Sequence, residues 1–394
     1  MNPKIKSIIV SFLPCHMRRQ VRELYSATII LNFAIAMVSI FEPVFLYTLF
    51  IKQYSLSTTL SFILLFYLVV YIAYFFCVPL GAKFVKRFGF EISIALGCVF
   101  MALFYFCLFA SSHYIGLIFV AIIVYVLWKM FYWPAYHGDF AKYSMDGEQG
   151  REVGDLIVLQ ALIYVAGPVV GGLLLQFYGF KSLFIFAAII IILSNVPMLI
   201  TKEKLIPQSF DYKSAFKRLF ARENRRKFIS LWGFGEEFIV LIIWPIFMFV
   251  IIKDFLGLGV ITGIATLITL LIYLYIGKLT DKKNHGYLLK IGELAYFFVW
   301  MLRALISSVG GVLLLDTASR LSKQAIAVPI VAETYEKAQD NSVMEGITFF
   351  EMSLVVGKII AIILALILVQ IFAFPWSAIF IMAGAMSLLY LLFK

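Results

Sequence analysis

Long apolar runs separated by short polar intervals extend along the whole chain. Crossing the ~30 Å hydrocarbon core of a bilayer takes about 20 helical residues, and the runs are of this length. Polar and apolar residues do not alternate within them, as they would in the strands of an outer-membrane barrel. The pattern predicts an all-α integral membrane protein with twelve transmembrane helices. The predicted spans are 25–50, 57–80, 91–111, 114–136, 153–176, 181–200, 228–252, 256–276, 288–308, 311–332, 343–371 and 375–393.

The longest polar interval, 201–227, divides the predicted spans into two sets of six. It carries nine cationic side chains against three acidic ones. These boundaries predict four parts: an N-terminal cytoplasmic or interfacial arm (1–24), a first six-helix bundle (25–200), a basic cytoplasmic linker (201–227) and a second six-helix bundle (228–394).

One stretch of the linker has the spacing of a helical face. Phe216, Leu219 and Phe220 recur three and four residues apart among basic neighbours. This spacing predicts an amphipathic helix on the inner leaflet, with anionic lipid headgroups as its partner.

Composition excludes an ordinary soluble domain. Hydrophobic residues make up 63% of the chain and charged residues 14%, whereas soluble domains have about 45–50% and about 25%. The net charge of +11 does not indicate a nucleic acid partner, because the cations form no zinc-finger, homeodomain or basic-zipper pattern. Most of them lie in intervals on the linker's side of the membrane, which predicts cytoplasmic N- and C-termini. The short intervals are typical of a multi-pass protein of a prokaryotic inner (plasma) membrane.

No metal, cofactor or enzymatic site is expected. The cysteines and histidines have no metal-ligand spacing. His16, His113, His137 and His285 fall at span ends or in loops, which predicts solvated or interfacial side chains. His-Glu-x-x-His, nucleophile-elbow and phosphate-loop motifs are missing from the sequence.

Matching segments recur in the two halves of the chain. Residues 81–89 (GAKFVKRFG) follow the second predicted span, and residues 277–286 (GKLTDKKNHG) follow the eighth. Pro43 and Pro245 form a weaker pair inside the first and seventh spans, where a proline can mark a bend used in gating. The two bundles are therefore predicted to be pseudo-symmetric copies of one six-helix unit.

These features together resemble the major facilitator superfamily of secondary transporters. The strongest part of the resemblance is Gly167-Pro168-Val169-Val170-Gly171-Gly172 in the fifth span, which is similar to the antiporter motif of that family. Glycines there allow a neighbouring helix to approach closely, and Pro168 leaves a carbonyl unpaired. Simple close packing would explain the run. The alternative is a bend that seals the outer half of the bundle, as in exporters of the family.

The family's loop motif is also present, and the second half of the chain matches it at more positions than the first half does. Gly277 and Asp281 match it in the second half, whereas in the first half Gly81 is followed by Val85 where the aspartate is expected. The resemblance implies that Asp139, at the cytoplasmic end of the fourth span, pairs with the cations of this first loop.

The resemblance implies a substrate site near the membrane midplane, lined mainly by the first, fourth, seventh and tenth helices. A charged group at that depth is costly unless it pairs or faces water, so each one is a candidate. The aromatic stripe with one lysine in the fourth span suits a flat or anionic ligand, although an interfacial belt with a snorkelling lysine has the same pattern. The charged face of the tenth span suits either a polar cavity or an internal ion-pair network. The substrate-cavity candidates are Asn32, Tyr125, Lys129, Tyr132, Trp133, Gln160, Tyr164, Asp316, Arg320 and Lys323.

Proton coupling needs a buried carboxylate that binds and releases a proton near neutral pH. Glu236 and Glu237 are adjacent, so their side chains point about 100° apart on a helix and at most one faces a given cavity. The candidates are Glu42, Glu236, Glu237, Asp316 and Glu351, of which Glu42 and Glu237 are preferred.

The sequence thus predicts a monomeric, proton-coupled secondary transporter that moves a small organic molecule by alternating access. The Gly-Pro run favours export, as in drug or metabolite efflux by proton antiport. Proton-coupled uptake of a sugar, amino acid or organic anion is the alternative. A transporter-like sensor or a lipid scramblase is the alternative from another class. The expected partners are the substrate, H⁺ and the lipid bilayer.

Overall fold

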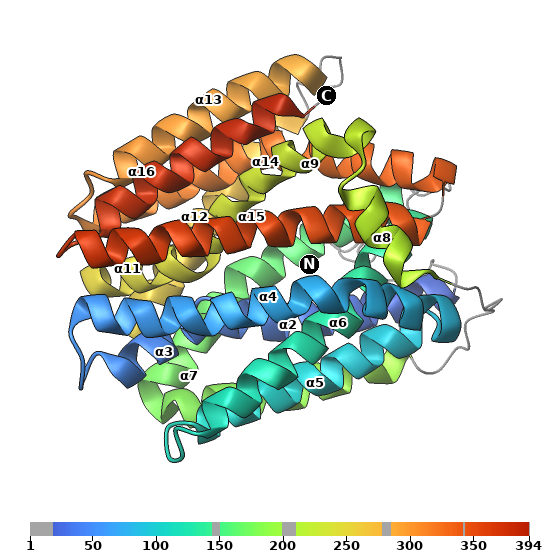
Figure 1. Ribbon diagram of the computed structural model, residues 1–394. Helices are drawn as coiled ribbons and strands as arrows, with labels where there is room; N and C mark the ends of the chain where they lie inside the picture. Colours follow the sequence, from blue (N-terminus) through green and yellow to red (C-terminus); the bar gives the residue numbers. More distant parts are fainter. Residues whose placement is uncertain (1–18, 144–149, 199–209, 278–284, 342, 394) are drawn as a thin grey trace, which may run out of the picture.

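The structure, a computed structural model, describes residues 19–143, 150–198, 210–277, 285–341 and 343–393. These residues form helices and turns, without a β-strand among them, which confirms the all-α expectation. The long helices run side by side as a bundle (Figure 1). The helical elements are α2 (Arg19–Val38), α3 (Phe41–Phe50), α4 (Leu56–Phe88), α5 (Phe90–Ala110), α6 (Leu117–Tyr143), α7 (Gly150–Met198), α8 (Tyr212–Leu219), η2 (Arg222–Asn224), α9 (Arg225–Leu231), η3 (Trp232–Phe234), α10 (Gly235–Phe238), η4 (Ile239–Ile243), α11 (Trp244–Ile252), α12 (Phe255–Gly277), α13 (His285–Arg303), α14 (Val309–Asn341), α15 (Val343–Ile371), α16 (Trp376–Ser387) and η5 (Leu388–Leu392).

Eight helical segments of the described chain are long and apolar enough to cross a membrane. One of them, in α7, contains two predicted spans, because the chain turns at Gly179, whose φ of 73° lies in the left-handed region that glycine tolerates. α13 and α14 match two further predicted spans but carry charged side chains, and α16 has only 12 residues. Every predicted span therefore corresponds to a helix, to a series of shorter helical segments or to an arm of α7.

Two spans change their helical geometry just before a proline. The first predicted span is interrupted at residues 39–40, between α2 and α3 and ahead of Pro43. In the seventh, Ile239–Ile243 form a π-helical turn ahead of Pro245. Proline cannot donate to the carbonyl four residues earlier, and its ring pushes that carbonyl aside. Such π turns are frequent at functional sites.

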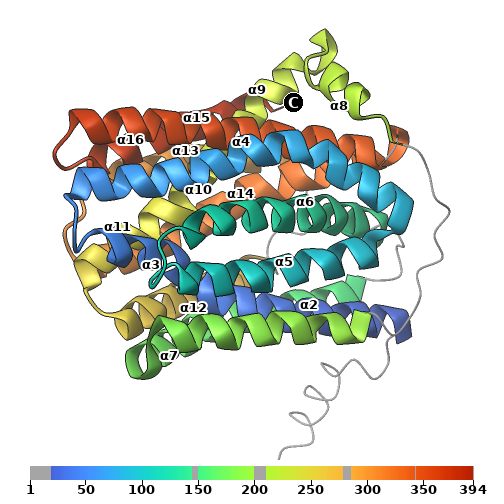
Figure 2. The same cartoon turned by 60° about the horizontal axis from the view of Figure 1, so that its bottom comes forward.

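Helices from opposite halves of the sequence pack directly on each other, α4 on α15 and α7 on α12. We call the end of the bundle that carries α8 the linker end, and the opposite end, where α3 connects to α4, the far end (Figure 2). At the far end the Ser57 hydroxyl donates to the Val369 carbonyl at 2.9 Å, and the Gln370 amide donates to the Ser61 hydroxyl at 2.9 Å. These bonds join α4 to α15.

The linker helix α8 docks on the linker end of the bundle (Figure 2). Phe216 packs on two rings of α4, Leu219 is fully buried, and Arg218 forms an ion pair of 2.9 Å with Glu345 of α15. Only Phe220, which is 69% exposed, keeps its apolar surface free. The predicted amphipathic helix is present. Two of its three apolar side chains pack on protein rather than on lipid, because they face the bundle, where α4 and α15 lie against α8.

Candidate functional site

Glu42 lies at the start of α3, directly after the helix break, and is 5% exposed. Its carboxylate accepts hydrogen bonds from the hydroxyls of Tyr67 on α4, at 2.9 Å, and Tyr105 on α5, at 3.2 Å. Both of these hydrogen-bond partners are neutral. Glu42 is thereby held by two neighbouring helices, and no cation among the described residues lies within ion-pair distance of its carboxylate.

Lys129 lies on α6 inside a cage of aromatic rings. Its Nζ lies 5.0 Å from the ring centroid of Tyr71 on α4 and 5.1 Å from that of Tyr125 on α6. Such distances are typical of cation–π contacts. Since Lys129 is 7% exposed, it does not snorkel to a membrane surface. The other rings of the cage are Tyr74 at 5.8 Å, Trp128 at 5.8 Å and Trp133 at 5.9 Å.

The predicted aromatic stripe of α6 divides between two neighbours. Lys129 turns toward Tyr71 of α4, whereas the backbone of Tyr132 packs against Gly97 of α5. The Tyr132 and Tyr136 rings stack with centroids 5.5 Å apart. Of the predicted stripe, Tyr125 and Trp133 therefore lie around the lysine, whereas Tyr132 packs on α5.

Of the candidates on the first and fifth predicted spans, Asn32 and Tyr164 are in contact. The Tyr164 hydroxyl of α7 donates to the Asn32 side-chain carbonyl of α2 at 3.5 Å. Tyr164 is 39% exposed, and Gln160, one turn earlier, is half-buried. These polar groups therefore line the α2–α7 contact.

Glu351 on α15 joins the two halves of the sequence. The Tyr74 hydroxyl of α4 donates to it at 2.9 Å, and Nε2 of His137 on α6 lies 3.0 Å from its other oxygen. The His137 side chain is 14% exposed. The expectation of a solvated or interfacial His137 is thus wrong, because helix packing brings it a carboxylate from the other half.

Glu236 is fully buried and bonds inside the second half of the sequence. Lys323 of α14 forms an ion pair with it, Tyr296 of α13 donates at 2.5 Å, and Tyr390 of η5 donates at 3.0 Å. Lys323 also donates to the Tyr390 hydroxyl at 2.6 Å. Lys323 is therefore part of a closed polar cluster.

Glu237 has different surroundings, as expected for adjacent side chains on a helix. Its partner is Lys358 of α15, at 2.8 Å. Lys358 also lies 5.8 Å from the ring centroid of Tyr71. Tyr71 thus stands beside lysines from both halves, Lys129 and Lys358.

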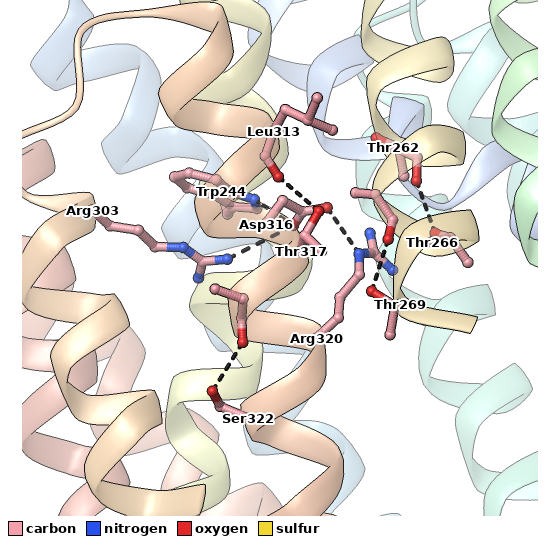
Figure 3. A network of polar contacts seen from close by, with 12 residues as sticks. Trp244, Thr262, Thr266, Thr269, Arg303, Leu313, Asp316, Thr317, Arg320 and Ser322 are labelled. Atoms are coloured by element: carbon pink, nitrogen blue, oxygen red, sulfur yellow. Dashed lines mark hydrogen bonds and ion pairs between the residues drawn. The ribbon is translucent and has the colours of Figure 1, made fainter. Parts of the chain in front are cut away.

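Asp316 on α14 is the centre of a third cluster (Figure 3). Arg320 Nε donates to it at 2.8 Å, Trp244 Nε1 donates at 3.0 Å, and Arg303 Nη2 lies 3.7 Å away. Figure 3 shows the two arginines approaching Asp316 from opposite sides. The Arg303 guanidinium lies between the rings of Trp244 and Trp300, with its carbon 3.9 and 4.4 Å from their centroids. The predicted internal pair of Asp316 and Arg320 is present.

Sequence reasoning missed Glu293, a second fully buried acid in the same half. It lies on α13 and accepts a hydrogen bond from the Ser387 hydroxyl of α16 at 2.9 Å, while its Oε2 has no hydrogen-bond partner. The sequence feature that could have identified Glu293 is its position as the single acidic residue of the predicted span 288–308.

The glycines of the Gly-Pro run pack in two directions. A Cβ at Gly171 would overlap the Met37 carbonyl of α2. On the other side, a Cβ at Gly172 would lie 2.9 Å from the Phe255 carbonyl oxygen at the start of α12. Gly259 of α12 in turn faces the Pro168 carbonyl. The run thus allows the backbones of α7 and α12, from opposite halves, to approach directly.

The loop-motif residues are described only in part. Gly81 packs its α-carbon against the Met130 carbonyl of α6. Asp139 is 9% exposed on α6, and Gly277 ends α12. Asp281, like residues 1–18 and 201–209 of the predicted arm and linker, lies outside the described residues.

Charged side chains paired between helices inside an apolar bundle are typical of membrane transporters. The chain belongs to the major facilitator superfamily, since the model of that family matches residues 24–319. Its fold is that of an all-α, multi-pass membrane protein, and its class is secondary transporter, because members of this family are transporters rather than enzymes. A comparison with curated proteins found no match.

Proposed function

We propose that this transporter exports a small organic molecule by alternating access between its two six-helix halves, in exchange for protons. The observation that supports export is the contact of α7 with α12 through Gly172 and Gly259, where the glycines leave backbone against backbone. Such a close backbone contact can seal one end of the substrate path between the two halves. It can open again without moving large side chains out of the way. We place the linker end and both termini in the cytoplasm of a prokaryotic cell, with the protein as a monomer.

Glu42 is the carboxylate that we propose to carry the proton. Glu236, Glu237 and Asp316 each contact a lysine or an arginine, and Glu351 contacts His137. The hydrogen-bond partners of Glu42 are tyrosine hydroxyls. A buried carboxylate without a counter-ion in contact is neutralised most simply by a proton. Glu237, whose side chain is 32% exposed, is the second choice.

Transport in proteoliposomes tests this assignment. A proton gradient should drive substrate movement in the wild type, and Glu42→Gln should abolish gradient-driven transport while substrate exchange persists. Glu345→Gln, at a surface ion pair with Arg218, is the matched control and should transport normally. Gradient-driven transport by Glu42→Gln at the wild-type rate would remove Glu42 from the mechanism.

Proton-coupled uptake of an organic anion, amino acid or sugar is the second candidate. It is favoured by Arg320, whose side chain is 35% exposed and uses only Nε to bond Asp316, so that its terminal nitrogens can receive an anionic group. Reversing the pH gradient in the same vesicles separates the two directions. A sensor or a lipid scramblase would show no substrate counterflow.

A further inference from the structure

Lys129 differs from Lys323 and Lys358, because it is buried and no described carboxylate lies within 4.0 Å of it. Lys358 contacts Glu237, and Lys323 contacts Glu236. Burial of a charge without a counter-ion is costly. Ring faces compensate only part of that cost, since one cation–π contact contributes about 0.5–2 kcal/mol. The site therefore favours an anion beside Lys129.

The ammonium group of Lys129 is also not fully enclosed by the protein. Its Nζ has no hydrogen-bond partner, yet it is not among the fully enclosed polar atoms of the described residues. The ammonium group therefore borders open space. The rings of Tyr71, Tyr125 and Trp133 lie around the ammonium group, with centroids 5.0, 5.1 and 5.9 Å from Nζ.

Neighbouring acids do not occupy this position. Both Glu42 oxygens accept bonds from tyrosine hydroxyls, and Glu237 is held by Lys358. These carboxylates lower the electrostatic cost of burying Lys129 from a distance, but they leave its three N–H donors unused.

We infer that the substrate is an organic anion with a planar apolar body, whose carboxylate pairs with Lys129 while its ring packs against Tyr71, Tyr125 and Trp133; as a statement about substrate, this rests on the proposed transport function. A small inorganic anion suits the cage less well, because aromatic walls cannot replace its hydration shell. A planar hydrocarbon body gains both from leaving water and from ring-to-ring contact.

Calorimetric titration of the full chain in detergent tests the site with three compounds of one shape: 2-naphthoate, 2-naphthamide and 2-naphthylmethylammonium. Benzoate and indole-3-acetate extend the carboxylate series. We expect carboxylates to bind, and the amide and the ammonium compound to bind at least about 30-fold more weakly, since losing one partner of a buried charge pair has an effect of this size.

The variants assign that preference to one side chain. Lys129→Met should weaken carboxylate binding by about 30-fold or more and leave amide binding unchanged, whereas Lys129→Arg should retain carboxylate binding. Lys181→Met, at an exposed position, is the control and should bind as the wild type does. Absence of binding by every carboxylate, equal binding of carboxylate and amide, or undiminished binding by Lys129→Met would overturn the inference.

Two further measurements cover a variant that does not fold and separate failure of the site from failure of the proposed function. If Lys129→Met does not purify as a folded protein, Tyr71→Leu must weaken 2-naphthoate binding and Lys129→Arg must retain it, and the opposite pattern overturns the site. Lys129-dependent binding without transport in proteoliposomes would refute the proposed function and leave the site intact. Transport of a neutral compound without Lys129-dependent binding would support the proposed function and refute the Lys129 site.

Discussion

At the scale of single residues, two lysines offer a matched comparison of buried ion pairs. Lys323 pairs with Glu236, whose side chain is fully buried, and Lys358 pairs with Glu237, whose side chain is 32% exposed. Removing one partner of a buried pair leaves an uncompensated charge and costs about 3–5 kcal/mol. Water screens a partly exposed carboxylate, so removing its lysine partner lowers the stability of the protein less. Lys323→Met should therefore lower stability far more than Lys358→Met.

Thermal unfolding midpoints of the two purified variants in detergent measure this difference. Glu236→Gln in the Lys323→Met background should recover part of the loss, because it removes the stranded charge. An equal or larger decrease in the midpoint for Lys358→Met would show that burial does not set the cost.

The sequence predicts which residues are charged at membrane depth better than it predicts their partners. Asp316 and Arg320 are four residues apart on one helix, so their pairing follows from helical spacing alone. Glu351 and His137 come from different halves, and only the packing of α15 on α6 brings them together. The position of His137 near a span end therefore indicated exposure, which tertiary contact overrides.

At the scale of helices, the glycine seam between α7 and α12 predicts a steric effect of one methyl group. Gly172→Ala would place a Cβ 2.9 Å from the Phe255 carbonyl oxygen and 3.0 Å from the Leu256 α-carbon. Because both are backbone atoms, α12 has to shift, at a cost of about 1–3 kcal/mol. Gly116→Ala is the control, since nothing lies within 4 Å of a Cβ there.

Thermal unfolding in detergent should show a lower midpoint for Gly172→Ala and little change for Gly116→Ala. A Gly172→Ala protein as stable as the wild type would mean that the seam is loose enough to accept a side chain.

The linker helix permits a second comparison at this scale. Leu219 is fully buried, and Phe220 is 69% exposed. Leu219→Ser should cost about 2–5 kcal/mol of local packing and undock α8 both in detergent and in bilayers. Phe220→Ser should leave docking intact in detergent but increase protease cleavage of the linker in vesicles that contain anionic lipid. Equal cleavage of the Phe220→Ser and wild-type proteins in those vesicles would exclude a membrane contact by this side chain.

Most of the helices follow from sequence because apolar runs of this length leave few alternatives to a membrane helix. The pairing of Pro43 with Pro245 correctly located two spans with altered geometry. It did not distinguish an interruption at residues 39–40 from a π turn at Ile239–Ile243, because the choice depends on how neighbouring helices satisfy the freed carbonyls.

At the scale of the whole molecule, the repeated loop after the second and eighth spans indicated two related halves but not how they meet. The contacts of α4 with α15 and of α7 with α12 join segments from opposite halves of the sequence. Spacing within one sequence carries no information on such contacts, whereas small residues such as Gly172 indicate where a close one is possible.

The contacts of Glu351 predict how the two halves separate at the linker end. Its carboxylate joins α15 to Tyr74 on α4 and to His137 on α6, and Ala141 of α6 lies fully buried against Ile347 of α15 nearby. Hydrogen bonds to a charged group contribute about 1.5–3 kcal/mol each, and about 1.4 kcal/mol changes an equilibrium tenfold. Glu351→Ala should therefore favour opening at the linker end.

The alkylation rate of Ala141→Cys, in a background without the native cysteines, measures that opening, because a buried thiol reacts only when α6 and α15 part. Glu351→Ala should accelerate it by about tenfold or more. Gln370→Ala removes a contact to Ser61 at the far end and should not accelerate alkylation at Ala141→Cys, since alternating access opens one end at a time. If both variants accelerate alkylation equally, the halves loosen as a whole and do not rock about a central site. If neither does, the Glu351 contacts do not hold the linker end closed.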